Sequence, residues 1–389
     1  MREQTTPRVF TSDLRDERNA ALLGVALGVT FTVCFVTGVL SHLIQDPPSW
    51  FQWPSRPAGL YRVTQGVHVA TGLASIPLLL AKLWVVFPKL FAWPPFSSVA
   101  HLVERLTIFP LVAGGVFELF TGLADTHLWY PWPFGFRAAH YWVAWITIGA
   151  LVVHIGAKWA TTRSALFVRD PTDAYLSVAE RPSGTHRQRE SAFDRRTFLA
   201  SVFAAAGAVT VFTVGQTVSP LRKLALLAPR RPDTGPQGFP VNRTAATAGV
   251  VEGARSPEYR LLVEGKVRRK LVFTRDQLLA MPQHEATLPI SCVEGWSTTQ
   301  RWRGVRVRDL LDRAGADSAA EVRVHSLQRR RAYRFSDLNR WHAHDPDTLL
   351  ALEVNGEPLD IDHGYPLRLI GPNRPGVMQT KWVTRLVAR

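Results

Sequence analysis

Long apolar runs separated by short polar segments fill the first half of the chain. Runs with at most one charged residue each occupy residues 20–44, 63–87, 106–124 and 138–160. Each is close to the roughly 20 residues that an α-helix needs to cross a bilayer. An uncharged fifth run follows at 197–218. The pattern predicts an all-α transmembrane helix bundle of four spans plus a fifth anchor span.

The apolar spacing shortens after residue 250. Tyr259, Leu261 and Val263 alternate with polar residues as in a half-buried strand, and a helix-like stretch follows at 275–280. This mixture predicts an α+β domain. The predicted parts are a membrane domain at 1–175, a cytoplasmic linker at 176–196, the fifth span at 197–218, a second linker at 219–249 and the α+β domain at 250–389.

Basic residues exceed acidic ones, 46 against 31, which gives a net charge of +15. They alternate with acids or stand beside the apolar runs, which argues against nucleic acid as a partner and favours membrane lipid. Lysine and arginine next to spans mark cytoplasmic loops. Most of these residues fall on the side of the N-terminus: Lys82, Lys89, Arg105, Lys158, Arg163 and Arg169. We expect a multi-pass protein of the cell (cytoplasmic) membrane whose N-terminus is in the cytoplasm.

Besides His42 near the end of the first, the predicted spans contain three histidines, His68 in the second and His140 and His154 in the fourth. The last two are 14 residues apart, which puts them on one helix face about 21 Å apart. A histidine in hydrocarbon is costly without a partner. Two facing imidazoles are what a six-coordinate b-type haem needs. A hydrogen bond to a neighbouring helix is the alternative for each histidine alone, and the set favours haem.

The second and fourth spans resemble the four-helix cytochrome b subunits of formate dehydrogenases and hydrogenases. The likeness rests on Gln65-Gly-Val-His68 and on the His140/His154 pair. It implies that His68 and His140 hold an outer haem b. It also implies that His154 is one ligand of an inner haem, so that the chain holds one or two.

The chain departs from this family where the inner haem needs its second ligand. Asn19 and Ala20 stand at the expected place, and His101 is a possible substitute. Glu118 lies inside the third span, where an ionisable residue indicates a function. A proton path, a quinol contact and a partner for Arg62 or Arg137 are its three interpretations.

The chain has two cysteines, and their settings differ. Cys34 lies within an apolar run, where a small buried thiol is ordinary. Cys292 ends an apolar stretch and enters a turn that contains Gly295. Two interpretations fit Cys292 by itself, a buried core cysteine and a thiolate that serves as nucleophile or soft metal ligand. A disulfide between the two would have to join a span to a separate domain, so we expect none.

The surrounding motifs resemble the sulfite oxidase / periplasmic methionine sulfoxide reductase superfamily. They follow in the family's order: Cys292-Val-Glu-Gly-Trp-Ser297, Trp302-Arg-Gly-Val305, Asn355-Gly-Glu-Pro-Leu359, Asp362-His-Gly-Tyr-Pro-Leu-Arg368 and Lys381-Trp382. The resemblance implies a sulfite-oxidase-like molybdopterin domain in which Cys292 is the catalytic molybdenum ligand. It places His363 and Arg368 at the pterin phosphate and Lys381 along the pterin. Because the chain ends soon after Trp382, we expect no added dimerisation domain.

The fifth run begins with Asp194-Arg-Arg-Thr-Phe-Leu-Ala200, which resembles a twin-arginine export signal. The alternative is the ordinary basic flank of a membrane helix. A buried pterin is inserted where it is made, in the cytoplasm, so a domain that holds it must cross the membrane folded. We therefore expect the molybdenum domain on the external side.

Together these features predict a molybdopterin-dependent oxidoreductase that passes electrons between the quinone/quinol pool, haem b and molybdenum. Its substrate would be a small oxo-donor or oxo-acceptor. Val293-Glu-Gly-Trp-Ser297 has no arginine to hold sulfite, which favours reduction of an S-oxide. A basic cluster argues the other way: Arg329, Arg330, Arg331 and Arg334. The alternatives are sulfite oxidation, a non-catalytic cofactor-binding or sensor protein, and a haem-containing ferric reductase.

Overall fold

The chain forms two compact units, which are described separately. The computed structural model describes residues 12, 14–90, 99–167, 194–330 and 332–389. Unit 1 comprises Met1–Val36 and His68–Phe212, and unit 2 comprises Thr37–Val67 and Thr213–Arg389. Unit 2 therefore contains the end of the first helix, the following loop and the first turns of the second helix.

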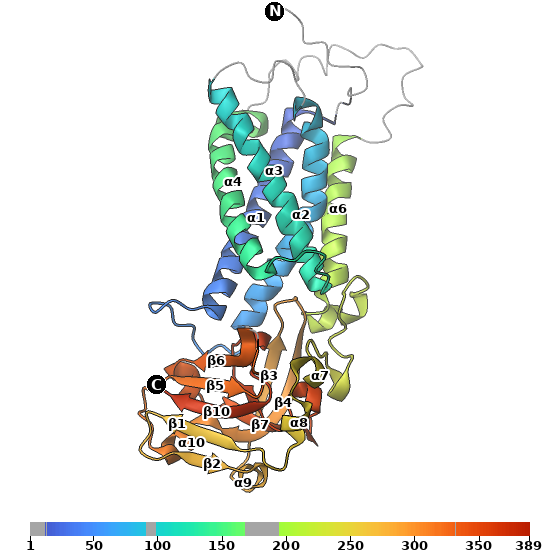
Figure 1. Ribbon diagram of the computed structural model, residues 1–389. Helices are drawn as coiled ribbons and strands as arrows, with labels where there is room; N and C mark the ends of the chain where they lie inside the picture. The colour runs from blue at the N-terminus through green and yellow to red at the C-terminus, as the bar shows by residue number, and fades with distance from the viewer. Residues whose placement is uncertain (1–11, 13, 91–98, 168–193, 331) are drawn as a thin grey trace, which may run out of the picture. The chain divides into compact units, whose positions relative to one another are not determined.

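Within the described ranges, five helices are long and apolar enough to cross a membrane by length and composition. They are α1 (Glu17–Gln45), α2 (Leu60–Leu90), α3 (Val99–Thr126), α4 (Phe136–Phe167) and α6 (Arg195–Val214) (Figure 1). The first four contain the apolar runs and extend beyond them. The fifth ends at Val214, before the predicted residue 218, because the chain folds tightly at Gly215. A Cβ there would collide with the backbone oxygen of Leu221.

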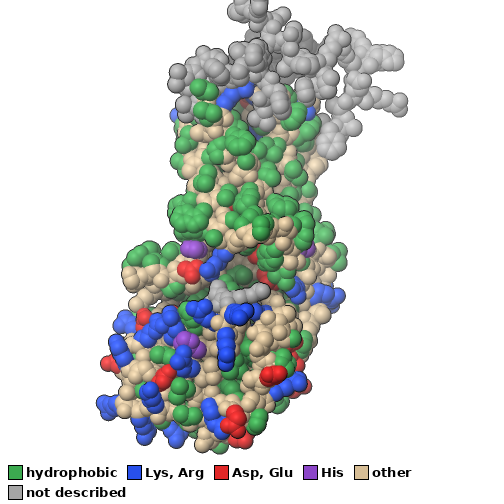
Figure 2. Space-filling model, viewed as in Figure 1, with side chains coloured by type: hydrophobic (Ala, Val, Ile, Leu, Met, Phe, Trp, Pro, Cys, Tyr) green, Lys and Arg blue, Asp and Glu red, His purple; other side chains and the backbone are tan. Residues whose placement is uncertain are grey.

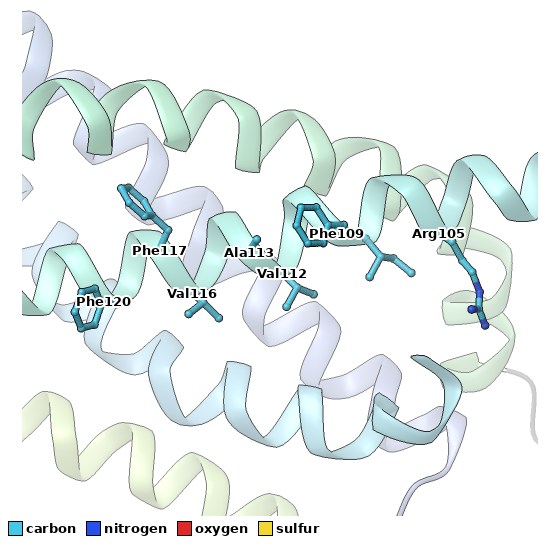
Figure 3. A pocket seen from close by; sticks show the side chains of 8 residues that line it. Arg105, Phe109, Val112, Ala113, Val116, Phe117 and Phe120 are labelled. Carbon is cyan, nitrogen blue, oxygen red and sulfur yellow. The ribbon is translucent and has the colours of Figure 1, made fainter. Parts of the chain in front are cut away.

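Apolar side chains cover the outward faces of these helices (Figure 2). Phe109 on α3 is 77% exposed, although exposed phenylalanine is unusual in water. A row of apolar side chains on α3 lines a groove of about 690 Å³ that runs from Arg105 to Phe120 (Figure 3). At 100° per residue, Glu118 falls on the other face of α3. An apolar outer face with the polar residue turned away is the pattern of a lipid-facing helix.

The α+β domain contains two sheets in the described part of the chain. The first has the order β2-β1-β10-β5-β6: Leu271–Phe273, Leu261–Gly265, Val383–Ala388, Val322–Ser326 and Phe335–Leu338. The second has the order β3-β4-β7-β8: His284–Ser291, Ser297–Arg306, Leu349–Val354 and Glu357–Pro358. β9 (Arg368–Ile370) also pairs with β7. Only β1 and β10 pair in parallel among these strands.

Short helices complete the domain: α7 (Ala245–Ala248), α8 (Val251–Arg255), α9 (Arg275–Leu279), α10 (Val307–Ala314) and α11 (Arg340–His344). In α10 the buried residues are Val307, Leu310, Leu311 and Ala314, one face of a helix that packs on the first sheet. The α+β fold class predicted for this part of the chain is confirmed.

The loop between α1 and α2 is built into unit 2 through Asn373. The Asn373 side chain accepts a hydrogen bond from the backbone N–H of Tyr61 (2.7 Å) and donates one to the carbonyl of Pro54 (2.7 Å). Its backbone carbonyl accepts from Trp53 Nε1 (2.9 Å), and its backbone N–H donates to the carbonyl of Ala58 (3.0 Å). All four polar groups of one residue are thus used to hold this loop.

Candidate active site

Cys292 lies in the short connection between β3 and β4, which we call the Cys292 turn (residues 292–297). The turn is closed by a hydrogen bond from the Cys292 N–H to the carbonyl of Trp296 at 2.8 Å. Gly295 has a φ of +96°, which a residue with a side chain rarely adopts. Cys292 is only 3% exposed, and its Sγ accepts a hydrogen bond from Asn242 Nδ2 at 2.8 Å. The thiol therefore has a fixed position and an N–H donor directed at it.

Asn242 also fixes the far side of the turn, because its Oδ1 accepts a hydrogen bond from Trp296 Nε1 at 3.2 Å. This asparagine falls in the segment 219–249 that the sequence predicts as a linker. Phe239, from the same segment, is 1% exposed and stacks on His363 with ring centroids 3.6 Å apart. Sequence reasoning missed both residues. One residue could have shown that this segment is folded and is not a linker. Thr244 is a helix-capping residue type, and its side chain caps α7 by accepting a hydrogen bond from the Thr247 N–H.

Arg368, which is buried, and Lys381, which is partly buried, are two neighbouring cations. Arg368 Nη1 donates to the carbonyl of His363 at 3.0 Å, and Lys381 Nζ donates to the carbonyls of Arg243 (2.5 Å) and Asp362 (2.8 Å). Burial lowers the pKa of Arg368 to about 9. Burial, and then Arg368, lower the pKa of Lys381 to about 7. Neither cation makes an ion pair with a carboxylate in the described ranges.

Gly364 brings these residues together. Its φ is +116°, and a Cβ at this position would lie 3.1 Å from Arg368 Cβ and 3.3 Å from Lys381 Cα. Preceding it, His363 is 1% exposed, and its Nε2 donates to the carbonyl of Pro236 at 2.8 Å. Burial, and then Arg368, lower the pKa of His363 to about 3, so the imidazole is neutral. The structure thus gathers the three residues predicted at the pterin.

The donor set fits a phosphate-bearing cofactor. Cations that are largely removed from water without a counter-ion are costly and are stabilised by an anion. The Nε of Arg368 is also buried and has no hydrogen-bond partner among the residues that the structure describes, and a planar guanidinium suits a phosphate. Cys292 adds a soft thiolate of the kind that a heavier transition metal prefers. These residues would hold a molybdenum pterin with Cys292 on the metal and Arg368 and Lys381 on the phosphate.

Arg374 is a further buried cation that sequence reasoning missed. It is 5% exposed and donates to the backbone carbonyls of Asp337 and Met378. Burial lowers its pKa to about 10. Its neighbour Pro375 forms a bridge with Ser291, the residue before Cys292. Nothing in the sequence pattern separates Arg374 from the many exposed arginines.

The basic cluster lies in the segment between β5 and β6. Arg329, Arg330 and Arg334 are exposed, and Arg331 lies outside the described residues. No hydrogen bond joins any of the three described arginines to the Cys292 turn. Glu294 is the charged residue of that turn, and it is buried.

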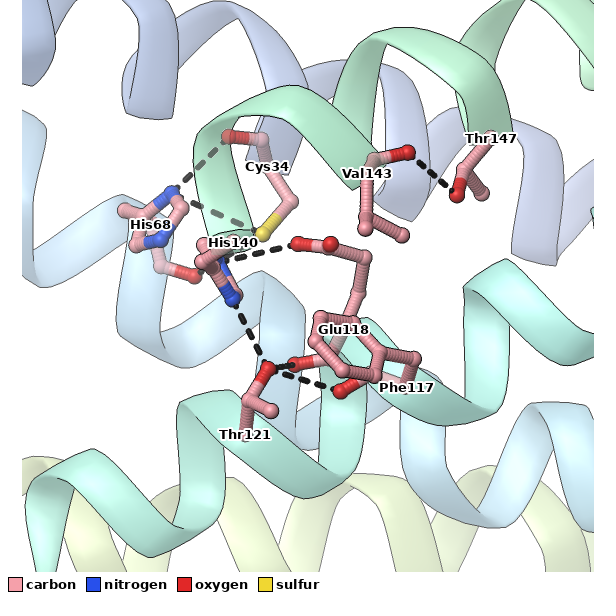
Figure 4. Close-up of polar contacts among 8 residues, drawn as sticks. All are labelled: Cys34, His68, Phe117, Glu118, Thr121, His140, Val143 and Thr147. Carbon is pink, nitrogen blue, oxygen red and sulfur yellow. Dashed lines mark hydrogen bonds and ion pairs between the residues drawn. The ribbon is translucent and has the colours of Figure 1, made fainter. Parts of the chain in front are cut away.

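Two of the predicted haem ligands face each other in unit 1 (Figure 4). The ring centroids of His68 and His140 are 6.5 Å apart. Two metal–imidazole bonds of about 2 Å each, extended to the ring centres, span about 6 Å. His68 Nδ1 donates to the carbonyl of Cys34 at 2.8 Å, the type of hydrogen bond that orients ligating histidines. The spacing fits one iron between the two rings.

Glu118 is the group that an iron would have to displace. Its Oε2 lies 3.0 Å from His140 Nε2, while His140 Nδ1 contacts Thr121 Oγ1 at 3.0 Å. Glu118 therefore pairs with His140. Arg62, one of the partners considered from the sequence, instead donates to Thr299 Oγ1 at 3.4 Å.

Fewer observations support the inner haem than support the haem between His68 and His140. His154 lies in the unbroken helix α4, 14 residues after His140, as the sequence indicates. The side chain of His101 lies outside the described part of the structure, so its pairing with His154 stays a prediction. Asn19 is fully buried and donates to the carbonyl of Leu14 at 2.8 Å, a structural role at the end of α1.

Comparison with known proteins shows what the C-terminal part of the chain is similar to. Residues 248–389 match the family of the oxidoreductase molybdopterin binding domain. The mitochondrial sulfite oxidase of Mus musculus is 35% identical over 155 residues, which cover 33% of this chain and 28% of that protein.

Two bacterial proteins are also similar. The putative protein-methionine-sulfoxide reductase subunit YedZ1 of Azospira oryzae is 30% identical over 164 residues, 42% of this chain and 60% of that protein. An uncharacterized oxidoreductase of Bacillus subtilis is 30% identical over 135 residues, 32% of this chain and 63% of that protein. The chain thus spans less than two thirds of each of these relatives. Its residues 248–389 form a molybdopterin-binding oxidoreductase domain.

Proposed function

We propose that this protein is a membrane-anchored molybdenum oxidoreductase that reduces an S-oxide or a similar oxo substrate with electrons from the quinone pool. The observation that carries the proposal is a fixed, buried thiol, Cys292, in the same domain as two cations, the buried Arg368 and the partly buried Lys381, that pair with no carboxylate among the described residues. Thiolate and cations together match the metal and the phosphate of one cofactor.

The residues around the cofactor bind and orient it. A molybdenum pterin supplies oxygen-atom transfer coupled to two electrons, and the protein sets its ligation and orientation. Cys292 provides the thiolate, and Asn242 donates a hydrogen bond to that sulfur. Arg368 and Lys381 hold the phosphate, while neutral His363 stays bonded to Pro236. The net reaction converts an S-oxide, two electrons and two protons into a sulfide and water.

The residues of the Cys292 turn support a neutral substrate. Glu294 is 7% exposed and follows Cys292 by two residues, so the turn carries an acidic residue and no arginine. A sulfite anion would find no cation in this turn, whereas a neutral S-oxide needs none. The name of the Azospira relative, a putative methionine-sulfoxide reductase subunit, points the same way.

Sulfite oxidation is the second candidate. The mitochondrial sulfite oxidase of mouse is 35% identical to this chain over 155 residues, which supports this candidate. The exposed arginines 329, 330 and 334 would supply charge for an anion if their loop closed over the centre. Direction of electron flow would then reverse, from the substrate to the membrane.

The apolar helices supply the electron link in this proposal. His68 and His140 would hold a haem b, and the groups that exchange electrons with it would be quinols in the bilayer. The excess of Lys and Arg beside the spans on the N-terminal side supports a cytoplasmic N-terminus. Five spans then put the molybdopterin domain on the external side.

Metal analysis and spectroscopy of the detergent-purified protein test the proposal. We expect molybdenum in the protein and a b-type band in the reduced-minus-oxidised spectrum. Reduced dye plus methionine sulfoxide should give turnover, and sulfite plus an electron acceptor should not. Sulfite turnover without sulfoxide turnover would establish the second candidate. Absence of molybdenum would refute both and favour a non-catalytic binding protein.

A further inference from the structure

The Cys292 turn is held by residues that border the apolar helices as well as by its own strands. The carbonyl of Val293 accepts a hydrogen bond from Gln65 Nε2 at 2.8 Å. The carbonyl of Gly295 accepts one from Thr217 Oγ1. The backbone N–H of Ser297 donates to the carbonyl of Gln216 at 2.8 Å. All of these residues belong to unit 2.

Gln65 is fixed at both ends of its carboxamide. The residue is 6% exposed, and its Oε1 accepts from Ser41 Oγ at 3.3 Å and from the Tyr61 hydroxyl at 3.4 Å. Ser41 and Tyr61 are themselves buried. A buried carboxamide is costly unless it is hydrogen-bonded, and an apolar side chain would fill the same space without that cost. The polarity of Gln65 therefore serves its contacts with Val293 on one side and with Ser41 and Tyr61 on the other.

The contact between Gln65 and Val293 matters because Gln65 lies close to His68 in the chain. Val293 is covalently bonded to Cys292. Gln65 precedes His68 by three residues in the unbroken helix α2, which is less than one helical turn. A continuous route of covalent bonds, with one hydrogen bond of 2.8 Å in it, therefore joins the Cys292 thiol to the backbone of His68.

We propose that Gln65 is a positioning residue that couples the molybdenum centre to the haem electronically, a proposal that rests on the function proposed above. With both groups bound, the haem would pass the two electrons of one quinol to the molybdenum centre one at a time. The centre would transfer the electron pair to the S-oxide, which takes up two protons and gives sulfide and water. Oxidation of the quinol to quinone supplies both electrons and, overall, both protons.

A matched pair of variants tests this coupling. Gln65→Leu removes the hydrogen bond to Val293 and keeps the side-chain size. Thr217→Val removes a hydrogen bond to the same turn, from a residue that is not on the helix of a predicted haem ligand. A light-generated reductant delivers one electron to the haem, and the decay of the ferrous band reports its transfer to molybdenum without turnover. The ratio of quinol-driven to dye-driven turnover with methionine sulfoxide is the second readout.

We expect Gln65→Leu to slow the decay of the ferrous band severalfold and to lower the turnover ratio, whereas Thr217→Val leaves both near wild type. Gln65→Met, which keeps an unbranched side chain, should behave like Gln65→Leu if that variant is poorly made. Equal decay rates in wild type and both Gln65 variants would overturn the coupling, and so would an equal loss in Thr217→Val. A protein without haem or molybdenum would instead refute the proposed function itself.

Discussion

Arg56, in the loop between α1 and α2, binds the carboxylate of Asp345 through two hydrogen bonds, Nε to Oδ2 at 3.1 Å and Nη2 to Oδ1 at 3.0 Å. The same Nη2 reaches Asp347 Oδ2 at 2.5 Å. The Asp345 side chain is 5% exposed and that of Arg56 is 51% exposed. A half-exposed cation thus compensates a buried carboxylate 289 positions away in the chain.

Replacing Arg56 with Ala should destabilise unit 2 by about 1–2 kcal/mol, because the value of this pair lies between those of exposed and buried ion pairs. Thermal unfolding in detergent and protease cleavage within residues 46–59 would measure the effect. The control is Lys89→Ala, which breaks the exposed pair with Glu17 and should change little. Equal stability of the two variants would contradict the role given to Arg56.

Replacing Cys292 with Ser should abolish molybdenum binding while the domain still folds. Serine keeps the size and the hydrogen bond from Asn242, but its hydroxyl is a poor ligand for a soft metal. Metal analysis of the purified protein gives the result. Cys34→Ser is the matched control and should keep its molybdenum. Full molybdenum content in the Cys292 variant would show that Cys292 is a buried core cysteine and not a metal ligand.

The stability of cofactor-free protein should rise with pH because of Lys381. Its pKa in the folded state is lowered to about 7, mainly by burial and then by Arg368. Between that value and the pKa of an unfolded lysine, about 10.4, the unfolded chain binds the extra proton. The free energy of unfolding therefore increases over this window, by about 2 kcal/mol between pH 7 and 9.

Lys381→Met should remove this part of the pH dependence, which thermal unfolding at several pH values would show. A bound phosphate favours the charged amine and raises its pKa, so loaded protein should show a flatter curve than cofactor-free protein. Identical curves for wild type and Lys381→Met without cofactor would contradict the low pKa.

Replacing His68 or His140 with Ala should eliminate a b-type band without preventing insertion into the membrane. One iron needs both imidazoles, so either loss is sufficient. The haem-to-protein ratio of purified variants measures it. His127→Ala is the control, because His127 follows the end of α3 and its Nδ1 bonds to the Leu123 carbonyl of that helix. An unchanged haem ratio in both variants would refute the pairing.

Changing both Arg195 and Arg196 to Lys should leave the molybdopterin domain inside the cell. The change keeps charge and hydropathy, so a simple membrane anchor would not respond, whereas a receptor that reads two arginines would. Protease added to spheroplasts should cleave residues 250–389 in wild type only. In the structure Arg195 also pairs with Asp16, so Asp16→Asn serves as a control for loss of that contact.

The regular elements could be predicted from the sequence because their signals are local. Apolar runs located the long helices, although they mark only the apolar part of each, and α3 begins at Val99 rather than near residue 106. The motif around His363 and Arg368 predicted a shared site, and the turn at Gly364 brings both next to Lys381. The roles assigned to these residues stay predictions.

The remaining contacts could not be predicted, because they join residues that are distant in the chain. Asn242 reaches Cys292 across 50 positions, and Gln65 reaches Val293 across 228. Neither residue belongs to a periodic pattern, and each is chemically ordinary. Only the folded chain shows that the hydrogen bonds of these amides meet at one turn.

The attachment of the loop at residues 46–59 to Asn373 and Asp345 has a consequence for biogenesis. In the proposed topology this loop emerges with the first pair of spans, whereas the molybdopterin domain folds around its cofactor in the cytoplasm and is transported later. Trp53 and Arg56 can then meet their partners only after transport. Binding of the loop at residues 46–59 to the molybdopterin domain then becomes the final maturation step. A domain exported in a misfolded form would not present the surface that this loop binds.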